Sequence, residues 1–414
     1  MSLKKVIASL LPGIFLIGYN IGTGSITSMS KSGANFGMDL LWAVLLSCLI
    51  TYYLINLFSK YTMVSGETVI QGMKKHISPA LVIVLITALS MIILAALMGV
   101  IGIIADVLSV WSETVFQKSI SPTFWAIITA AIVYLVVYFG SYSSFEKILA
   151  VLVSIMGLAF IISMFIEFPG MGEIAGGLVP KLPKETVNSD NSAGVIIAGM
   201  VGTTVSVFAF IIRSQIVKDT GWKMADNKLQ RRDALVSVSL MFILSAAVLI
   251  TATSTLHAKG LKMNSVSEMI PLLEPLAGDA ALGIFVLGII AAGLSSHLPN
   301  LLVIPWLIID YKDSERDTRT PLFRIILLLL SVVSVIGAIL GFKPIFILLV
   351  SQACIAVVLP LTLAGVFYLT GKASLMKSHK NSKAQILFNL VILALSLYLS
   401  YLAIGGLWQD LFGS

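Results

Sequence analysis

The chain has 414 residues, of which 58% are hydrophobic and 11% are charged, and its mean hydropathy is +1.00. This composition excludes an ordinary water-soluble domain and predicts an all-α integral membrane protein. The formal net charge of +7 is better explained by basic loops on one side of a membrane than by a nucleic-acid partner. The two cysteines, Cys48 and Cys354, lie in apolar runs and indicate no disulfide framework.

Eleven apolar segments are long enough to cross a membrane as helices. We expect these spans at 6–30, 39–60, 80–107, 122–140, 147–167, 194–217, 234–256, 280–309, 322–341, 344–370 and 384–408. The longest loops between them are 168–193 and 218–233, and the second is expected to be a short interfacial helix or a linker. We therefore expect a single transmembrane domain over 1–414.

Lysine and arginine are distributed unequally between the two sets of loops. With the N-terminus placed inside, 20 of the 27 basic residues fall on the inner side and the remaining 7 on the outer side. Basic residues are concentrated in cytoplasmic loops. We therefore expect the N-terminus in the cytoplasm and the C-terminus outside, in what we take to be a bacterial plasma membrane.

The first span is interrupted near its middle by Tyr19-Asn20-Ile21-Gly22-Thr23-Gly24-Ser25. A break at this depth exposes backbone N–H and C=O groups that lipid cannot satisfy, so it persists only where protein or a watery cavity surrounds it. In secondary transporters, the substrate binds at such breaks. Glycines for close helix packing, with hydroxyls bonded to the backbone, are the alternative explanation.

Several short blocks follow in order over nearly the whole chain. They are Ile21-Gly22-Thr23-Gly24-Ser25, Gly33-Ala34-Asn35-Phe36-Gly37, Ser65-Gly66-Glu67-Thr68, Phe145-Glu146-Lys147, Gly202-Thr203-Thr204-Val205, Ala291-Ala292-Gly293-Leu294-Ser295-Ser296 and Ser351-Gln352-Ala353. No single block is specific, but together they resemble the Nramp family of metal-ion transporters.

The resemblance implies a LeuT-like fold with two inverted repeats of five spans, about 6–167 and about 194–370. Spans one and six would be broken, and 384–408 would be an additional eleventh helix. It also implies a secondary transporter that moves a divalent cation, Mn²⁺ or Mg²⁺, by alternating access. No enzymatic activity and no cofactor are expected, and the expected partners are the transported solute and the lipid bilayer.

The residues at the implied ion site differ from the family pattern. Gly22, Thr23 and Ser25 stand where the family has Asp, Pro and Asn in the first span. In span six, Ser206 stands at the place of the family Met and Phe208 at that of a His. A transition-metal site usually includes a carboxylate and often a soft sulfur or an imidazole. These replacements therefore predict weak metal binding.

Other positions follow the same trend. Gly99 replaces the acidic residue of span three and Arg213 replaces a second histidine of span six, whereas Gln352 in span ten is retained. Mg²⁺ keeps several waters and is the more plausible metal, although its sites normally contain a carboxylate. Two alternatives stay open: transport of a small non-metal solute, and a transport-inactive sensor or partner protein.

We expect the substrate at the two breaks and at span ten. The candidate binding residues are Asn20, Gly22, Thr23, Gly24, Ser25, Thr203, Ser206, Phe208 and Gln352. A structural role is the alternative for several of them: Asn20 as a helix cap, Gln352 in a bond between helices, and the Thr203 region as uninterrupted helix.

Three polar residues within the spans are candidates for coupling or gating. They are His297, Asp106 near the outer end of span three, and Arg213 near the inner end of span six. Histidine titrates near neutral pH, and ionisable groups within spans are often functional. The alternatives are a satisfied buried imidazole, an aspartate that reaches water, and an arginine that extends to the lipid headgroups.

Overall fold

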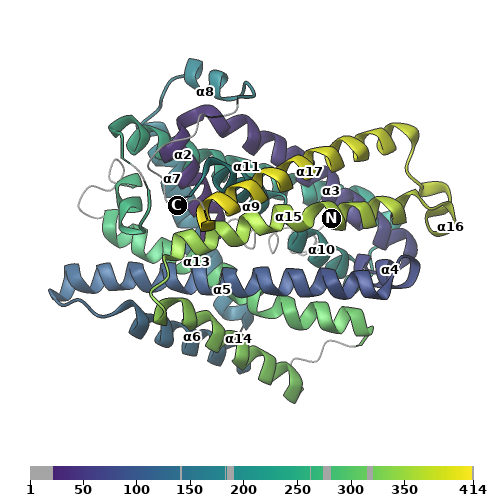
Figure 1. The fold of residues 1–414 in the computed structure, drawn as a ribbon, viewed down its shortest axis with the longest axis horizontal. Coiled ribbons are helices and arrows are strands. Elements are labelled where there is room, and N and C mark those ends of the chain that lie inside the picture. The colour runs from purple at the N-terminus through teal and green to yellow at the C-terminus, as the bar shows by residue number, and fades with distance from the viewer. Residues whose placement is uncertain are drawn as a thin grey trace, which may run out of the picture.

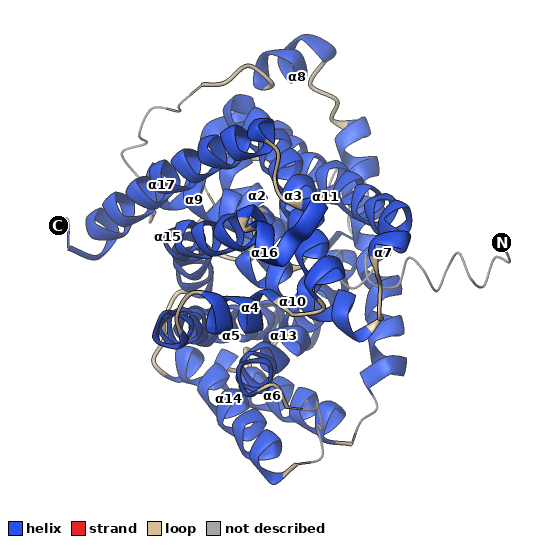
Figure 2. Cartoon of the chain, turned by 90° about the vertical axis from the view of Figure 1, so that its right-hand side faces the viewer, coloured by secondary structure: helices blue, strands red, loops and turns tan. Residues whose placement is uncertain are grey.

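The computed structural model describes residues 22–139, 142–181, 183, 191–261, 263–273, 281–314 and 320–412. Within these residues the secondary structure consists of helices and turns without a strand, and most helices run roughly along one axis (Figures 1 and 2). The first half of the expected first span, including Asn20, lies outside the described residues.

The helices overlap the expected spans, although α5 continues to Phe116 instead of 107 and α11 begins at Asn227 instead of 234. In the first half they are α2 (Thr23–Phe36), α3 (Leu41–Ser65), α4 (Val69–His76), α5 (Pro79–Phe116), α6 (Pro122–Tyr138), α7 (Tyr142–Ile166) and α8 (Met171–Gly177). In the second half they are α9 (Ala193–Thr204), α10 (Val207–Asp219), α11 (Asn227–Thr255), α13 (Ala281–Lys312), α14 (Pro321–Ile339), α15 (Pro344–Gly371), α16 (Ala373–Met376) and α17 (Lys383–Phe412). Short 3₁₀ turns cover Gly37–Leu40, Met224–Asp226, His257–Lys259, Ser267–Leu272 and Lys377–His379.

Side-chain caps fix the starts of four long helices. The hydroxyls of Ser78, Ser121, Ser192 and Thr320 accept hydrogen bonds from backbone N–H groups of α5, α6, α9 and α14, respectively. A proline follows the cap in α5, α6 and α14, where its missing N–H costs nothing. These local signals explain why the helix starts agree with the sequence to within a few residues.

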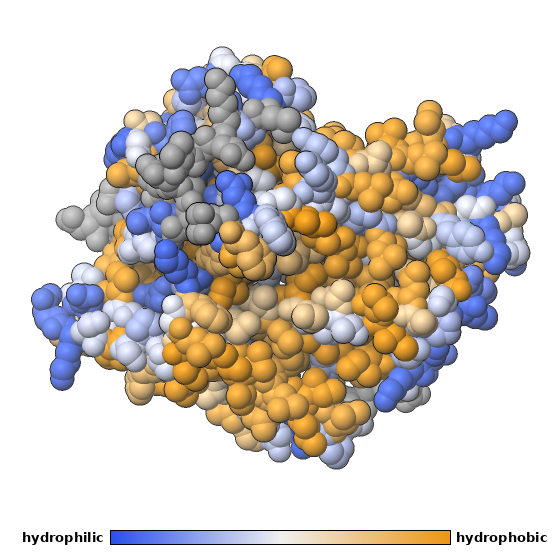
Figure 3. All heavy atoms as spheres, in the orientation of Figure 1, coloured by the Kyte–Doolittle hydropathy of each residue, from blue (hydrophilic) through white to orange (hydrophobic). Residues whose placement is uncertain are grey.

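The helices are long and apolar enough to cross a bilayer. Eight helical stretches in the described part of the chain meet this criterion, or nine when the bent pair Val151–Ile166 and Met171–Gly177 is counted as one span. Hydrophobic side chains cover most of the middle of the face in Figure 3, and hydrophilic ones gather toward the two ends of the long axis. The protein is therefore an integral membrane protein.

Span six is broken, as the resemblance to the Nramp family implies, and the alternative of uninterrupted helix around Thr203 is wrong. The backbone leaves the helical region at Val205 (φ −92°, ψ 61°) and Ser206 (φ −82°, ψ 118°), between α9 and α10. The Thr51 hydroxyl of α3 donates a hydrogen bond to the Thr204 carbonyl oxygen (2.8 Å) and so satisfies one end group of α9. The break therefore forms in a run without glycine or proline because a neighbouring helix supports it.

The inner loop after span six differs from expectation. We expected an interfacial helix or a linker over 218–233, but α10 continues to Asp219 and α11 begins at Asn227. The start of α11 is buried against its neighbours, because the Gln230 side-chain amide donates to the Ser59 hydroxyl (3.0 Å) and Asp233 is 1% exposed. Because of these contacts, residues 227–233 belong to span seven.

The two parts of span six lie in the interior of the bundle. All side chains in the most apolar window of Ala193–Asp219 are buried within the protein. Helix α9 packs against α15, α17 and α2, and α2 also contacts α11, α13 and α15. Figure 2 looks along the bundle from the end that carries α4 and α16 and shows α2 and α9 between the surrounding helices. This packing places the start of α2 beside the break in span six.

Candidate substrate site at the helix breaks

A small cavity of about 40 Å³ lies between the start of α2 and the break in span six. It has room for only a few water-sized species. Its lining comes from α2, α5, α9, α10, α13 and α15. The polar part of the lining is Ser25, Thr203, Ser206, Ser296, Asn300 and Gln352, with the backbone of Gly22 and Gly24, and the apolar part is Ile92, Ile93, Ala96, Val100, Phe208, Leu348 and Ile355.

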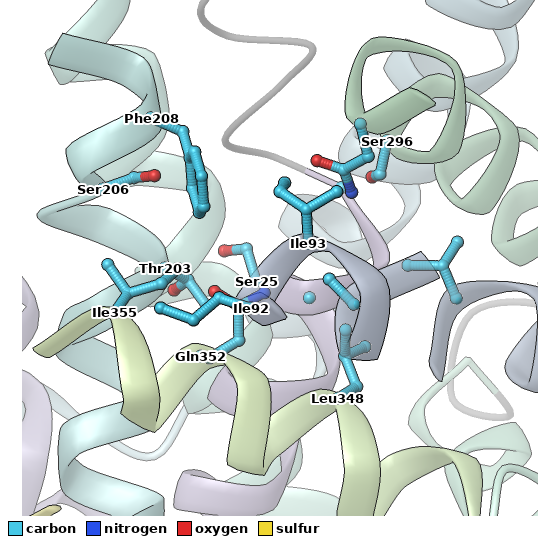
Figure 4. A pocket seen from close by; sticks show the side chains of 15 residues that line it. Ser25, Ile92, Ile93, Thr203, Ser206, Phe208, Ser296, Leu348, Gln352 and Ile355 are labelled. Carbon is cyan, nitrogen blue, oxygen red and sulfur yellow. The ribbon is translucent and has the colours of Figure 1, made fainter. Parts of the chain in front are cut away.

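Most of the predicted binding residues come together at this cavity. Those that line it are Gly22, Gly24, Ser25, Thr203, Ser206, Phe208 and Gln352. Figure 4 shows Ser25, Thr203 and Gln352 approaching one another, with Ser296 on the opposite side. Thr23 is fully buried beside the cavity but is not part of its lining. The structure thus gathers residues from both halves of the chain at one point.

The glycines at the start of α2 allow the helices to approach closely. A Cβ atom at Gly22 would lie 1.5 Å from Ser296 Oγ, and one at Gly24 would lie 3.0 Å from Gln352 Nε2. The Thr23 backbone N–H donates a hydrogen bond to Ser296 Oγ (3.2 Å). Glycine therefore brings the backbone of α2 within reach of α13 and α15.

Two of the hydroxyl groups at the cavity donate hydrogen bonds to backbone carbonyl groups. Thr203 Oγ1 donates to the Met200 carbonyl (3.0 Å), and Ser296 Oγ donates to the Ala292 carbonyl (2.8 Å). A hydroxyl that donates its only proton elsewhere can act only as an acceptor on its remaining lone pairs. Thr203 Oγ1 thus keeps both lone pairs, and Ser296 Oγ, which also accepts the Thr23 N–H, keeps one, so both can accept only from a cation or a hydrogen-bond donor.

The break in span six adds backbone groups of two kinds, carbonyl acceptors from α9 and N–H donors from α10. Helix α9 ends at Thr204 and α10 begins at Val207, so the last carbonyl groups of α9 and the first N–H groups of α10 have no partners within their own helices. Ser206 is the cap residue of α10 and is 3% exposed, yet its side chain makes no capping hydrogen bond. Its hydroxyl is thus available to the cavity.

Two lining residues were not among the predicted ones. Ser296 and Asn300 both come from α13 and contribute a hydroxyl and an amide. They are four residues apart, so they lie on the same face of the helix. This pair of polar residues in an apolar span is the sequence signal that could have identified them.

The three coupling or gating candidates do not converge on the cavity. His297 is fully buried, and within the described residues neither of its ring nitrogens has a hydrogen-bond partner. Asp106 is half-buried on α5, ten residues beyond Ala96 and so about 15 Å farther along the helix. Neither side chain lines the cavity, so their roles stay predictions.

Arg213 does not extend to the headgroups, which corrects one of our expectations. Its side chain is completely buried, and Nη1 lies 2.6 Å from Asp233 Oδ2 of α11. Its Nε also donates to the Ser59 hydroxyl of α3 (3.3 Å). The guanidinium is held inside the protein because α11 supplies an equally buried carboxylate.

The cavity is an oxygen site without formal charge. In the part of the chain that the structure describes, no group of three or more His, Cys, Asp or Glu side chains could hold a metal ion. Any cation would therefore be bound by hydroxyl, amide and carbonyl oxygens. Such neutral oxygen ligands suit hard cations better than soft transition metals.

A buried polar cavity at a helix break, enclosed by apolar helices, is the arrangement found in LeuT-like secondary transporters. The comparison with solved structures supports this class of fold. The structure is similar to that of a manganese transporter of Eremococcus coleocola, with a TM-score of 0.78 and 18% sequence identity, over 99% of this chain and 89% of that one.

The sequence comparison identifies the family. The family described as natural resistance-associated macrophage protein-like, Nramp, matches residues 13–405, so the chain belongs to the Nramp family. It is 27% identical over 315 residues to a divalent metal cation transporter of Nostoc, covering 72% of this chain and 68% of the relative. It is 25% identical over 421 residues to one of Klebsiella pneumoniae, covering 98% and 96%.

Proposed function

We propose that this protein is a secondary transporter that moves a divalent metal cation by alternating access through the cavity at the helix breaks. The observation that carries the proposal is the orientation of the cavity hydroxyls. Thr203 and Ser296 donate their protons to backbone carbonyls, so their remaining lone pairs, two on Thr203 Oγ1 and one on Ser296 Oγ, can accept only from a cation or a donor. The family relatives named as divalent metal cation transporters support the same conclusion.

The donor set indicates a hard cation. Neutral oxygen ligands without a carboxylate compensate poorly for dehydration, so binding is expected to be weak. Mn²⁺ and Mg²⁺ accept oxygen ligands, whereas softer ions gain nothing from a site without sulfur or imidazole. With about 40 Å³ available, the ion sheds most of its water unless the cavity widens.

A network of polar side chains closes the bundle on the side that we assign to the cytoplasm. Asp310 of α13 accepts hydrogen bonds from Thr68 Oγ1 (2.9 Å) and from Gln215 Nε2 of α10 (3.1 Å). The Arg213–Asp233 pair joins α10 to α11 beside it. In alternating access these contacts separate when the cavity opens inward. The N-terminus lies inside and the C-terminus outside a plasma membrane, as the basic loops indicate.

Cation flux into proteoliposomes tests the proposal. We expect uptake of Mg²⁺ or Mn²⁺ that saturates only above about 1 mM, since the site lacks charge. Gln352→Leu removes an amide from the cavity and should lower uptake at least about fivefold. Ser396→Ala removes a buried hydroxyl of α17 outside the cavity and should leave uptake unchanged. Uptake of no cation in a panel of Mg²⁺, Mn²⁺, Cd²⁺ and Ca²⁺ would contradict the proposal.

A further inference from the structure

A second polar cavity has a lining distinct from that of the cavity at the break in span six. Its volume is about 210 Å³, and it lies between the inner ends of α3, α11 and α17. Its lining includes Tyr53, Asn56, Lys60, Arg231 and Gln385. None of these residues lines the cavity at the breaks, so this second cavity is a separate site.

The inner-end cavity carries positive charge without a counter-charge. Lys60 Nζ donates to the amide oxygen of Asn381 (3.0 Å), a neutral partner. Within the described residues, neither Lys60 nor Arg231 forms a salt bridge. Two cations that share a cavity with amide and phenol groups match an anion with several oxygens, such as a phosphate.

One face of α3 leads from this cavity into the membrane. Leu46, Leu49, Tyr53, Asn56 and Lys60 follow one another at intervals of three or four residues and so share that face. Along this face the side chains change from leucine to tyrosine, then to the amide of Asn56 and the ammonium of Lys60. Leu49 is 59% exposed. From Leu49 to Lys60 the helix rises about 16 Å, close to the half-thickness of a bilayer's hydrocarbon core.

Helix α17 forms a fixed wall beside this face. The Tyr53 ring packs edge-on against Phe388, with 4.8 Å between ring centroids. The Tyr53 hydroxyl donates a hydrogen bond to Asn389 Oδ1 (2.6 Å). In the same turn of α17, Leu387 and Leu390 are 66% and 57% exposed. The surface beside the cavity thus exposes leucines toward the membrane, and the cavity itself carries basic groups.

We propose that the inner-end cavity binds the phosphate headgroup of an anionic phospholipid from the cytoplasmic leaflet, with an acyl chain along Leu46 and Leu49. Basic pockets between helices on the cytoplasmic side are suited to such headgroups. Free phosphate has the same anionic chemistry, but it lacks an acyl chain that could pack on Leu46 and Leu49. The leaflet follows from the basic residues at this end of the bundle.

Lipid retention measured by native mass spectrometry of the full chain tests the site. The probes are phosphatidylglycerol and phosphatidylcholine with identical acyl chains. The double variant Lys60→Gln, Arg231→Gln should lose the preference for phosphatidylglycerol by at least about tenfold. The matched control Lys228→Gln, Arg232→Gln removes one lysine and one arginine at exposed positions outside the cavity and should keep the preference.

Three results would overturn the proposal. They are an equal loss in both double variants, an unchanged preference in the Lys60→Gln, Arg231→Gln protein, and displacement of the lipid by millimolar inorganic phosphate. Should the double variant fail to fold, Arg231→Gln alone changes an exposed side chain and should still weaken retention about fivefold, whereas Lys60→Arg should preserve it. The readout is lipid binding, so it does not depend on the proposed transport.

Discussion

Gly22 shows how one position limits the chemistry of the cavity. Its φ of −102° is open to any residue, so backbone strain does not require glycine there. The neighbouring helix α13 requires glycine at this position, because a Cβ atom on residue 22 would lie 2.8 Å from the Cβ of Ser296 and still closer to its hydroxyl. A carboxylate cannot be restored at this place without moving α2 away from α13. Ser206 is the better position, because it lies in extended backbone at the break.

We predict that wild-type protein binds Mn²⁺ with a dissociation constant above about 1 mM and that Ser206→Asp binds it at least about tenfold more tightly, a gain of about 1.4 kcal/mol. A carboxylate attracts a divalent ion strongly in a cavity with little water. Aspartate is also a favourable cap for α10, so the fold should tolerate it. Titration calorimetry measures the gain, with Ser206→Asn as the neutral control. Equal affinity of the two variants would place the ion elsewhere.

At the scale of elements, the Arg213–Asp233 pair joins α10 to α11 inside the protein, with both side chains fully buried. We predict that Asp233→Asn lowers the free energy of unfolding by about 3–5 kcal/mol, because it leaves a buried guanidinium without a counter-charge. Denaturant unfolding in mixed micelles measures the loss. Replacing both residues by apolar ones, Arg213→Met with Asp233→Leu, should recover most of it. A loss below about 1 kcal/mol in the single variant would show that the pair is not buried as described.

The turn between α3 and α4 gives a second prediction for an element. Burial alone would raise the pKa of Glu67, but hydrogen bonds from Lys75 and His76 outweigh it and hold the pKa below its ordinary value. The ionised form is therefore favoured in the folded protein, and the stability it provides is present above the ordinary pKa and is lost as the pH falls through the folded value.

We therefore predict that the unfolding midpoint of the wild type falls more steeply than that of Glu67→Gln between about pH 5 and about pH 3. Thermal unfolding of the two proteins in the same detergent provides the comparison. Exposed Glu173 on α8 is a suitable control position, and Glu173→Gln should follow the wild-type curve. Parallel curves for wild type and Glu67→Gln would contradict the assignment.

The sequence predicted elements better than contacts between them. Apolar length predicted the helices, and the resemblance to the family implied a break in span six, which lies at Val205 and Ser206. The site was predicted in part: Gln352 and Thr203 line the cavity as expected, whereas Asn300 was missed. A polar side chain in an apolar span could have marked Asn300, but its place at the cavity depends on how α13 packs against α2 and α5. The burial of Arg213 was missed for the same reason, because its partner lies on the next helix.

For the whole molecule, the charge distribution predicts an inner N-terminus and an outer C-terminus. In a protein with Cys48 and Cys354 replaced by alanine, a cysteine at exposed Glu173 should react with an impermeant reagent in intact cells. A cysteine at exposed Ser378 should react only after permeabilisation. The parent without cysteines is the control for background labelling, and reaction of Ser378→Cys in intact cells would reverse the orientation.

Anomalous scattering from Mn²⁺ tests the central claim most directly, namely that the cavity at the helix breaks holds the transported cation. Crystals would be grown with Mn²⁺ at roughly ten times the concentration that half-saturates its flux. We predict an anomalous peak within coordination distance of the side-chain oxygens of Ser25, Thr203 or Gln352, between α2, α9 and α15. A peak elsewhere in the bundle, or none in the cavity at that concentration, would contradict the account.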